Sequence, residues 1–344
     1  MGAAQLAQTP RGFVVAQNWK IVVTRQIPEA GLALLRDMGT VTVWEDELPP
    51  SAEQLDVLLG DADGALTLLT DRIDGAVLDR HPNLKVVSNF AVGYDNVDAD
   101  AASERGVIVC NTPGVLTAAT ADHTWALLMA AARRIPESME YVRKGKWRTW
   151  GPLLLLGQEI SGATLGVIGL GRIGKEVARR ASGFGMRVLA HDEYQDAEFA
   201  ARNDIQYADL DTVLRESDFV TLHVALTPET RHLIGSVEFG KMKPTAILIN
   251  ASRGPVVDTE ALVSALQTGE ILAAALDVTD PEPLPADHPL VNMDNCIVVP
   301  HTASATVQTR DAMATLAARN LVTGLEGKQP PASVNYDAAM ANRA

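Results

Sequence analysis

Cysteine is scarce in this chain: its 344 residues include only Cys110 and Cys296, each within a short apolar run. Two thiols this far apart do not form the closely spaced pattern of a disulfide framework or a zinc site. We interpret both as small buried hydrophobic residues that stay reduced. A reducing compartment favours a cytoplasmic location.

Long apolar runs are also missing. No stretch reaches the roughly 18 apolar residues that a membrane-spanning helix needs. Residues 1–18 are polar and lack the apolar core of a secretory signal peptide. We therefore expect no membrane association and a loose extension over residues 1–18.

Positive charge is in deficit. The chain carries 29 Lys and Arg against 43 Asp and Glu, a formal net charge of −14. A nucleic-acid surface needs clustered cations, so we exclude that class of partner. Apart from His191 and His301 the chain has five histidines, and none has a metal-binding spacing such as HExxH, so we expect no metal. They are His81, His123, His223, His232 and His288.

The sequence does contain TLGVIGLGRIGKEVARR, residues 164–180, and the rest of the chain is organised around it. An apolar run over 165–168 predicts a buried strand, and the spacing after the glycines predicts a helix. The first glycine permits a tight turn, the second lets a pyrophosphate approach the backbone, and the third lets helix and strand pack closely. The phosphates would lie at the helix N-terminus. The candidate cofactor-binding residues here are Gly169, Gly171, Arg172, Ile173 and Gly174.

A second strand, residues 186–191, completes a βαβ unit and ends at Asp192. This is the position of the acid that binds the adenosine ribose hydroxyls of a dinucleotide. A glycine turn alone could be purely structural. With both strands and the helix in place, the pattern predicts a nicotinamide cofactor, and Asp192 favours NAD.

Short apolar strands alternate with helical segments along the chain, which predicts parallel sheets covered on both faces. Further strands are expected over 20–24, 41–44, 65–69, 86–89, 107–110, 219–224, 246–250, 273–277 and 297–299. Helices are expected over 28–38, 51–59, 120–134, 210–215, 260–266 and 306–325. Pro136 is expected to end the helix from Thr120, residues 145–157 to form a loop, and a polar tail to follow Leu325.

Three polar residues follow strands in the second half of the chain: Arg253, Glu282 and His301. Open α/β sheets bind ligands beyond the carboxyl ends of their strands. A guanidinium can clamp a carboxylate, and imidazole is the best proton donor near neutral pH. Alone, each has a simpler interpretation: a surface salt bridge, a solvated loop acid and a structural histidine.

Seven longer motifs occur in order: NFAVGYDNVD (89–98), NTPGVLTAATAD (111–122), WGPLLLLG (150–157), LHVALTPETRHLIG (222–235), INASRGPVVD (249–258), DVTDPEPLPADHPL (277–290) and PHTASATVQTR (300–310). Through them the chain, from about Lys20 to Asn335, resembles the D-isomer-specific 2-hydroxyacid dehydrogenases. Within that family it is most similar to the glyoxylate/hydroxypyruvate reductases.

The resemblance implies a catalytic triad. Arg253 would bind the carboxylate of a 2-oxoacid, and His301 would protonate its carbonyl oxygen as hydride reaches the carbon. Glu282 would hold the imidazole tautomer and favour its protonated form. Backbone N–H groups near Val92 and Gly93 would help to hold the carboxylate.

Other roles are implied in the same way. Leu69 would line the substrate pocket, and Trp150 would reach the partner subunit's active site in a homodimer. Asp277 and the Ala251 carbonyl would hold the nicotinamide carboxamide. From the residues alone, ordinary packing is the simpler interpretation of Leu69 and Trp150. Ala303 stands where many relatives have glycine, and we expect tighter packing there.

The fold that the resemblance implies is α/β, with two doubly wound parallel-sheet domains. A Rossmann-type cofactor domain, residues 117–306, is inserted in a discontinuous flavodoxin-like substrate domain, residues 19–116 and 307–336. The active site is expected in the cleft, with hinge closure on substrate. The apolar helix from Thr120 and the tryptophan loop suit a homodimer interface.

The implied activity is NAD-dependent reduction of small 2-oxoacids such as glyoxylate or hydroxypyruvate. NADP-using relatives carry a Ser-Arg pair where this chain has Asp192 and Glu193. One alternative is a phosphite or phosphoglycerate dehydrogenase, although we expect no regulatory domain after Asn335. A second alternative is an NADH-sensing co-regulator, since such relatives keep the same triad.

Overall fold

The computed structural model describes residues 18–343, which divide into two compact units. The first unit comprises the described residues up to Thr112 together with those from Asp311 onward. The second comprises Pro113–Arg310. The sequence prediction placed the domain limits at 116 and 307. The extension predicted over residues 1–18 lies, except for Asn18, outside the described residues.

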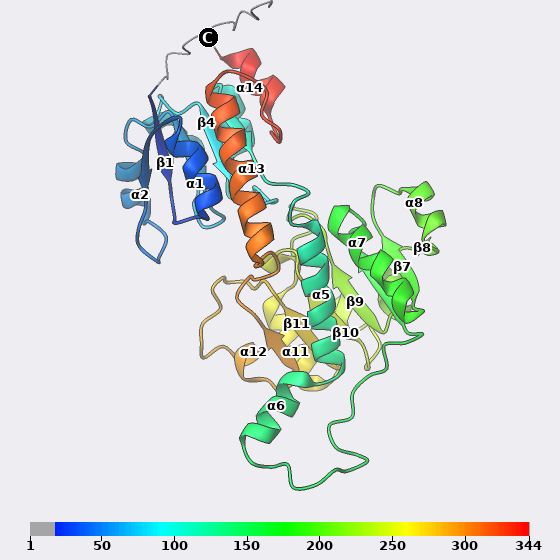
Figure 1. Ribbon diagram of the computed structural model, residues 1–344. Helices are drawn as coiled ribbons and strands as arrows, with labels where there is room; N and C mark the ends of the chain where they lie inside the picture. Colours follow the sequence, from blue (N-terminus) through cyan, green and yellow to red (C-terminus); the bar gives the residue numbers. More distant parts are fainter. Residues whose placement is uncertain (1–17, 344) are drawn as a thin grey trace, which may run out of the picture. The chain divides into compact units, whose positions relative to one another are not determined.

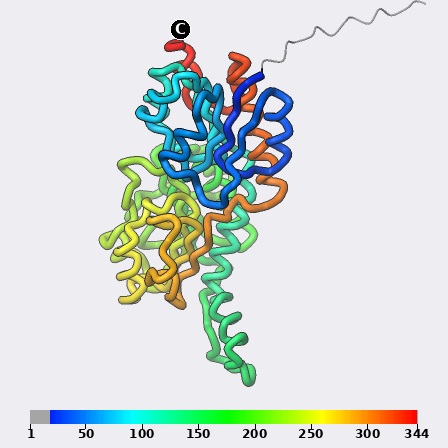
Figure 2. Tube along the Cα trace, turned by 90° about the vertical axis from the view of Figure 1, so that its left-hand side faces the viewer, coloured from blue at the N-terminus to red at the C-terminus, as the bar shows by residue number. Residues whose placement is uncertain are grey.

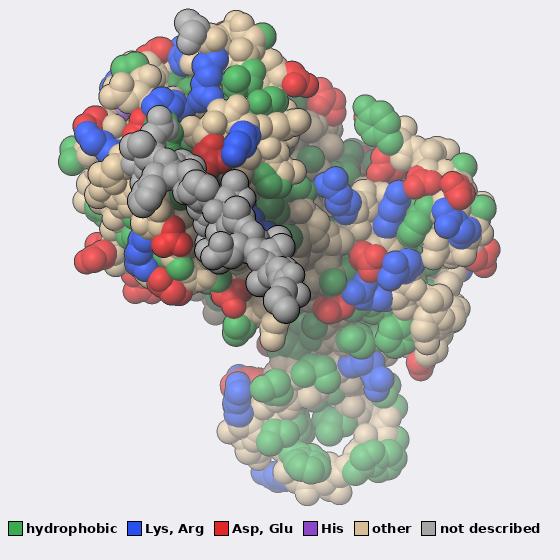
Figure 3. Space-filling view, turned by 45° about the horizontal axis from the view of Figure 1, so that its top comes forward, with side chains coloured by type: hydrophobic (Ala, Val, Ile, Leu, Met, Phe, Trp, Pro, Cys, Tyr) green, Lys and Arg blue, Asp and Glu red, His purple; other side chains and the backbone are tan. Residues whose placement is uncertain are grey.

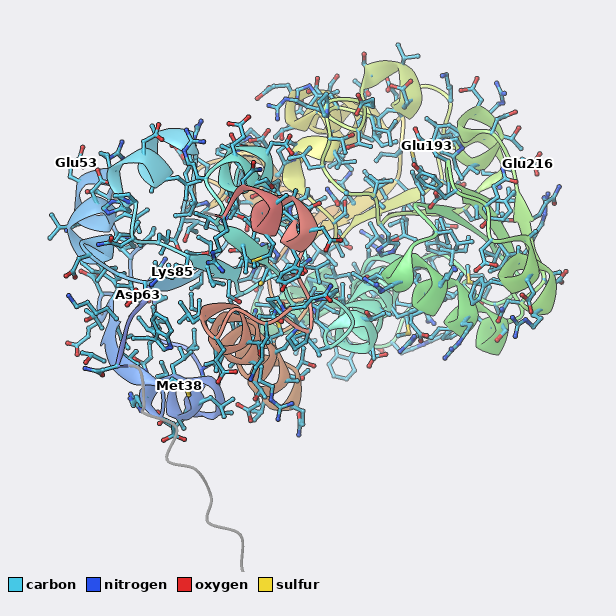
Figure 4. All side chains as sticks on the ribbon, turned by 90° about the horizontal axis from the view of Figure 1, so that it is seen from above. Met38, Glu53, Asp63, Lys85, Glu193 and Glu216 are labelled. Carbon is cyan, nitrogen blue, oxygen red and sulfur yellow. The ribbon has the colours of Figure 1, made fainter. Side chains whose placement is uncertain are left out.

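The first unit is built on five parallel strands in the order β2-β1-β3-β4-β5. They are β1 (Trp19–Val23), β2 (Gly39–Val43), β3 (Gly64–Thr67), β4 (Val86–Asn89) and β5 (Ile108–Cys110). This is the doubly wound order of flavodoxin-like folds, and it confirms the predicted class. Asp63 and Lys85 precede β3 and β4, and their side chains pair at 2.7 Å (Figure 4).

Helices cover both faces of this sheet (Figure 1). They are α1 (Glu29–Arg36), α2 (Ala52–Leu59), α3 (Gly75–Arg80), α4 (Ala99–Glu104), α14 (Tyr336–Asn342) and the part of α13 (Val307–Leu325) from Asp311 onward. On one face, Val22 and Val87 pack against α2, α3 and α4. On the other, the Ser88 hydroxyl donates to the Ala317 carbonyl of α13 at 2.8 Å. Adjacent residues of β4 thus face opposite helical layers.

The second unit contains seven parallel strands in the order β12-β11-β10-β9-β6-β7-β8. They are β6 (Thr164–Ile168), β7 (Arg187–His191), β8 (Ile205–Tyr207), β9 (Phe219–Leu222), β10 (Ile247–Asn250), β11 (Ala273–Leu276) and β12 (Cys296–Val298). The order reverses direction between β6 and β9, as in a Rossmann-type sheet. Ligands bind such sheets at this reversal, beyond the carboxyl ends of the strands.

The helices of the second unit are α5 (Thr117–Ala132), α6 (Ile135–Arg143), α7 (Arg172–Ala181), α8 (Ala197–Arg202), α9 (Leu210–Glu216), α10 (Ser236–Phe239), α11 (Thr259–Thr268) and α12 (Pro289–Asn292), with short 3₁₀ turns at Ser182–Phe184 and Gly254–Val256. α5 and α7 pack on one face of the sheet around Trp125 and Val167. α9, α10 and α11 pack on the other around Phe239 and Leu248. The central strands β9, β10 and β11 are therefore buried on both faces.

Three sequence predictions need correction. Pro136 does not end the helix from Thr120, because α5 stops at Ala132 and the proline lies in the first turn of α6, where its missing N–H costs nothing. The tail after Leu325 is not simply polar: it includes α14, whose Ala339 is buried. The apolar residues of α5 fill the core of the second unit, so they give no support to a dimer interface.

The segment from α6 to Gly157, called here the arm, extends from the rest of the second unit (Figure 2). It contains the predicted loop over 145–157 and exposes large apolar side chains, which Figure 3 shows gathered there. Trp150 is 78% exposed and Leu153 is 81% exposed. Among residues 18–343, no helix is long and apolar enough to cross a membrane.

Candidate active site

The glycine turn between β6 and α7 is shaped by close backbone contacts. A Cβ on Gly174 would lie 2.0 Å from the Gly169 carbonyl oxygen, so only glycine fits there. Gly169 has a φ of 92°, a conformation that side-chain-bearing residues rarely adopt. A Cβ on Gly171 would meet no atom within 4 Å. The N-terminus of α7 is therefore open to a diphosphate, and the residues present fit a dinucleotide.

Asp192, directly after β7, is tied to this turn. One carboxylate oxygen accepts the backbone N–H of Leu170 at 2.6 Å, and the other accepts that of Tyr194 at 2.8 Å. Each oxygen retains a further lone pair for a ribose hydroxyl. Glu193, labelled in Figure 4, follows on the same turn and is exposed. The turn thus presents two adjacent carboxylates.

His301 and Glu282 are in direct contact. The Nδ1 atom of His301 lies 2.6 Å from Oε1 of Glu282, in hydrogen-bond range. His301 has a φ of 52°, and its N–H donates to the Asp277 carbonyl at 2.9 Å. A carboxylate on Nδ1 leaves Nε2 as the ring nitrogen that can exchange a proton with a substrate.

Asp277 organises the backbone that follows His301. Its side chain is 1% exposed, and its two oxygens accept the N–H groups of Thr302 and Ala303 at 2.7 and 3.0 Å. His123 of α5 places Nε2 at 3.2 Å from Oδ1, an ion-pair distance without hydrogen-bond alignment. Burial opposes ionisation of Asp277, but the neighbouring His123 and Thr302 N–H outweigh it and hold its pKa below the usual value.

The turn that carries Arg253 lies against the loop that carries Glu282. A Cβ on Gly254 would lie 1.9 Å from the Thr279 carbonyl oxygen, so the two backbones touch at this glycine. The side-chain amide of Asn250, the last residue of β10, donates to the Arg253 carbonyl at 2.9 Å and fixes the start of the turn. Ala251 follows β10 directly and is buried.

Leu69, Val92 and Gly93 belong to the first unit and so lie apart in the chain from the groups above. Leu69 is not part of β3, which ends at Thr67, but lies in the turn that follows. Val92 and Gly93 lie in the loop after β4, and their carbonyls accept the amides of Asn111 and Asn89 at 2.7 and 2.9 Å.

Sequence reasoning missed His123 as a neighbour of the site. It lies on a helix whose contact with β11 is formed only in the folded chain, and no spacing indicates it. His223 follows β9, and Gly169 packs against its backbone; burial lowers the pKa of His223 to about 3, so it is no second acid. Within residues 18–343, no group of three or more His, Cys, Asp or Glu is arranged to hold a metal ion.

A Rossmann-type sheet, an open glycine turn and a His–Glu pair at the strand ends together define a nicotinamide-dependent oxidoreductase. The comparisons with known proteins give the family. Residues 125–303 match the model of the D-isomer specific 2-hydroxyacid dehydrogenase NAD binding domain. The chain belongs to this family of dehydrogenases.

Relatives and solved structures cover most of the chain. A glyoxylate reductase of Thermofilum pendens is 50% identical over 322 residues, which span 92% of this chain and 95% of that protein. A crystal structure of a Thermus thermophilus protein is 46% identical, with a TM-score of 0.86 over 92% of this chain and 99% of that one. An NADPH-dependent glyoxylate/hydroxypyruvate reductase from Sinorhizobium meliloti, solved with NADP and malonate, is 32% identical, with a TM-score of 0.84 over 95% and 99%.

Proposed function

We propose that this enzyme reduces small 2-oxoacids, glyoxylate and hydroxypyruvate foremost, to the corresponding 2-hydroxyacids with NADH. The observation that carries the proposal is the 2.6 Å contact between His301 and Glu282. Glu282 and His301 follow β11 and β12, which belong to the same sheet as β6, the strand that precedes the glycine turn. The names of the relatives support the choice of glyoxylate.

The chemistry assigns each triad member one task. When bound, the nicotinamide supplies a hydride to the carbonyl carbon. Arg253 binds the substrate carboxylate and polarises the adjacent carbonyl. His301 delivers a proton from Nε2 to the carbonyl oxygen, so hydride plus proton complete the alcohol. Glu282 accepts a hydrogen bond from the Nδ1–H of His301 and so leaves Nε2 free to donate to the substrate.

The cofactor preference rests on the turn after β7. Asp192 and Glu193 would accept hydrogen bonds from a ribose but repel the 2′-phosphate of NADP. The Asp192 carboxylate is held in place by two backbone N–H groups. We therefore propose NAD rather than NADP, in contrast to the NADPH-dependent relative from Sinorhizobium meliloti.

The remaining assignments come from the family resemblance. Asp277 and the Ala251 carbonyl would hold the nicotinamide carboxamide. Val92 and Gly93 would hold the substrate carboxylate through their N–H groups, and Leu69 would form a wall against the substrate side chain. The carbonyls of Val92 and Gly93 are fixed by asparagine amides, which supports a preformed loop.

We further propose a homodimer formed through the arm, with Trp150 reaching the partner subunit's active site. The support is the row of exposed apolar side chains on α6 and after it, since exposed clusters of this size mark interaction surfaces. They are Ile135, Met139, Val142, Trp147, Trp150, Leu153, Leu154 and Leu156.

A cytoplasmic location remains a prediction from the two thiols. Both cysteines are free. Burial raises the pKa of both thiols, and that of Cys296 reaches about 12. Cys296 as a whole residue is half-buried. Thiols held in this form are poor nucleophiles and are suited to a reducing compartment.

A turnover assay at the NADH absorbance tests the activity. The panel contains glyoxylate, hydroxypyruvate, pyruvate and 2-oxobutyrate, with phosphite and 3-phosphoglycerate assayed in the NAD⁺ direction. We expect the highest kcat/KM with glyoxylate and hydroxypyruvate. Turnover of phosphite or 3-phosphoglycerate, with no turnover of any 2-oxoacid, would support another dehydrogenase of the superfamily. NADH binding without turnover of any compound would support a co-regulator.

A further inference from the structure

A tight turn over residues 68–71 follows β3 and contains Leu69. The Leu68 N–H donates to a carboxylate oxygen of Asp71 at 2.7 Å, and the Asp71 N–H donates back to the Leu68 carbonyl at 3.1 Å. The Thr24 hydroxyl of the neighbouring strand end donates to the same Asp71 carboxylate. The turn is therefore closed at both ends, and Leu69 has little freedom.

Asn96 crosses this turn from a separate segment. Its side-chain Nδ2 donates to the carbonyls of Leu68 at 3.0 Å and Asp71 at 2.8 Å, the two residues that close the turn. Carbonyl oxygens only accept hydrogen bonds, so they fix which end of the Asn96 amide faces the turn. The same Nδ2 also lies 3.4 Å from Oδ1 of Asn89, a longer contact than those to the two carbonyls.

Asn89 continues the network to the loop after β4. It is fully buried, and its Nδ2 donates to Oδ1 of Asn96 at 3.0 Å and to the Gly93 carbonyl at 2.9 Å. Its own Oδ1 accepts the Thr67 hydroxyl at 3.2 Å. The side-chain amides of Asn96 and Asn89 thus connect the Leu69 turn to the Val92–Gly93 loop.

We propose that Asn96 is a positioning residue that sets the size of the 2-oxoacid accepted, by fixing the Leu69 turn relative to the Val92–Gly93 loop. The inference rests on the proposed function, in which that loop holds the substrate carboxylate and Leu69 faces the substrate side chain. Asn96 itself touches neither. With the Asn96 amide in place, Leu69 is held at a fixed distance from the loop that would bind the substrate carboxylate. A substrate with a small side chain then fits best.

Removal of the amide has a defined consequence. In Asn96→Ala, the Leu68 and Asp71 carbonyls lose their shared donor, and the Asn89 amide loses one of its two acceptors. A displacement of about 1 Å in a substrate contact costs up to roughly a hundredfold in rate. We expect the KM for glyoxylate to rise about tenfold, and the preference for glyoxylate over 2-oxobutyrate to fall by a similar factor. The NADH dissociation constant should stay unchanged, because the glycine turn lies in the other unit.

Asn335→Ala is the matched control. The Asn335 amide also donates within the first unit, to the Val107 carbonyl at 3.0 Å and to the Ser103 hydroxyl at 3.0 Å. It contacts neither the Leu69 turn nor the Val92–Gly93 loop. We expect a loss of thermal stability in both variants and a change in KM and substrate preference only in Asn96→Ala. Asn96→Ser, which keeps one donor, gives an intermediate effect and replaces the alanine variant should that one fail to fold.

The test is steady-state kinetics on the full-length wild type and these variants with glyoxylate, pyruvate and 2-oxobutyrate, alongside NADH fluorescence titration. Raised KM and relaxed preference at constant NADH affinity support the proposal. An Asn96 variant with wild-type KM and preference, differing only in stability as Asn335→Ala does, overturns it. A wild type without turnover of any 2-oxoacid would instead contradict the proposed function.

Discussion

The carboxylate of Asp192 accepts the backbone N–H of Leu170 at 2.6 Å. The acid after β7 is thereby tied to the glycine turn after β6, so the proposed ribose-binding and diphosphate-binding groups belong to one hydrogen-bonded element. The arrangement predicts a strong discrimination between the two nicotinamide cofactors.

We expect kcat/KM for NADH to exceed that for NADPH by about a hundredfold or more at saturating glyoxylate. Like charges about 4 Å apart cost roughly 4 kcal/mol at an effective dielectric near 20, and each 1.4 kcal/mol is about a factor of ten. Asp192→Ser combined with Glu193→Arg should shift the preference towards NADPH. Glu193→Gln alone serves as a control that keeps Asp192. Equal kcat/KM values in the wild type would contradict the assignment.

Asp71 gives a pH dependence of stability. Burial raises its pKa above the usual value of 3.8, although the Thr24 hydroxyl, the Leu68 N–H and the Arg25 charge partly offset this. The folded state therefore holds the proton more tightly than the unfolded state, and this contribution is lost as the pH rises through the folded pKa. The free energy of unfolding of Asp71→Asn minus that of the wild type should increase from about pH 4 to pH 7. Calorimetry across this range measures it, and a difference that falls with pH would contradict the burial argument.

The arm predicts the oligomeric state. Light scattering at micromolar concentration should give about twice the chain mass. Trp147→Glu with Leu153→Glu places two charges among exposed apolar side chains and should yield a monomer with reduced activity. Val57→Glu, at an exposed apolar residue of α2, is the control and should stay dimeric. A monomeric wild type with full activity would remove the role of Trp150 as well.

Gly254 predicts a coupling between the Arg253 turn and the Glu282 loop. Gly254→Ala would place a methyl group 1.9 Å from the Thr279 carbonyl oxygen and must force the two segments apart. We expect a loss of about 1–3 kcal/mol in stability and a fall in kcat of about tenfold or more. Gly183→Ala, where a Cβ meets no atom within 4 Å, should leave kcat unchanged. Wild-type kcat in Gly254→Ala would show that the two segments act independently.

The sequence predicted the βαβ unit well because its strand, glycines, helix and terminal acid are all local signals. It misjudged Pro136 because a proline can either follow the end of a helix or stand in the first turn of the next one. The sequence alone did not show that a second helix, α6, begins at Ile135, directly before this proline. It extended the strand before Leu69 by two residues, since the Thr24 and Asn96 side chains that bind the turn come from elsewhere in the chain.

The supporting network of the site was beyond sequence reasoning for a physical reason. His123 meets Asp277 only because α5 packs across β11, far along the chain. Asn96 meets the Leu69 turn across 28 positions of sequence. The proposed triad residues follow strands and can be anticipated from that, whereas His123 and Asn96 reach their partners only through tertiary contact.

The central claim is that His301 is the proton donor, and the rate of reduction in His301→Ala tests it most directly. The measurement is kcat with glyoxylate and saturating NADH, beside the NADH dissociation constant and the same kinetics for Arg253→Ala. General acid catalysis contributes about 10²–10⁴-fold, so His301→Ala should lose kcat by that order with NADH affinity little changed. Arg253→Ala should also raise KM sharply, because it binds ground state and transition state alike. Near-normal kcat in His301→Ala on every accepted 2-oxoacid would show that another group supplies the proton.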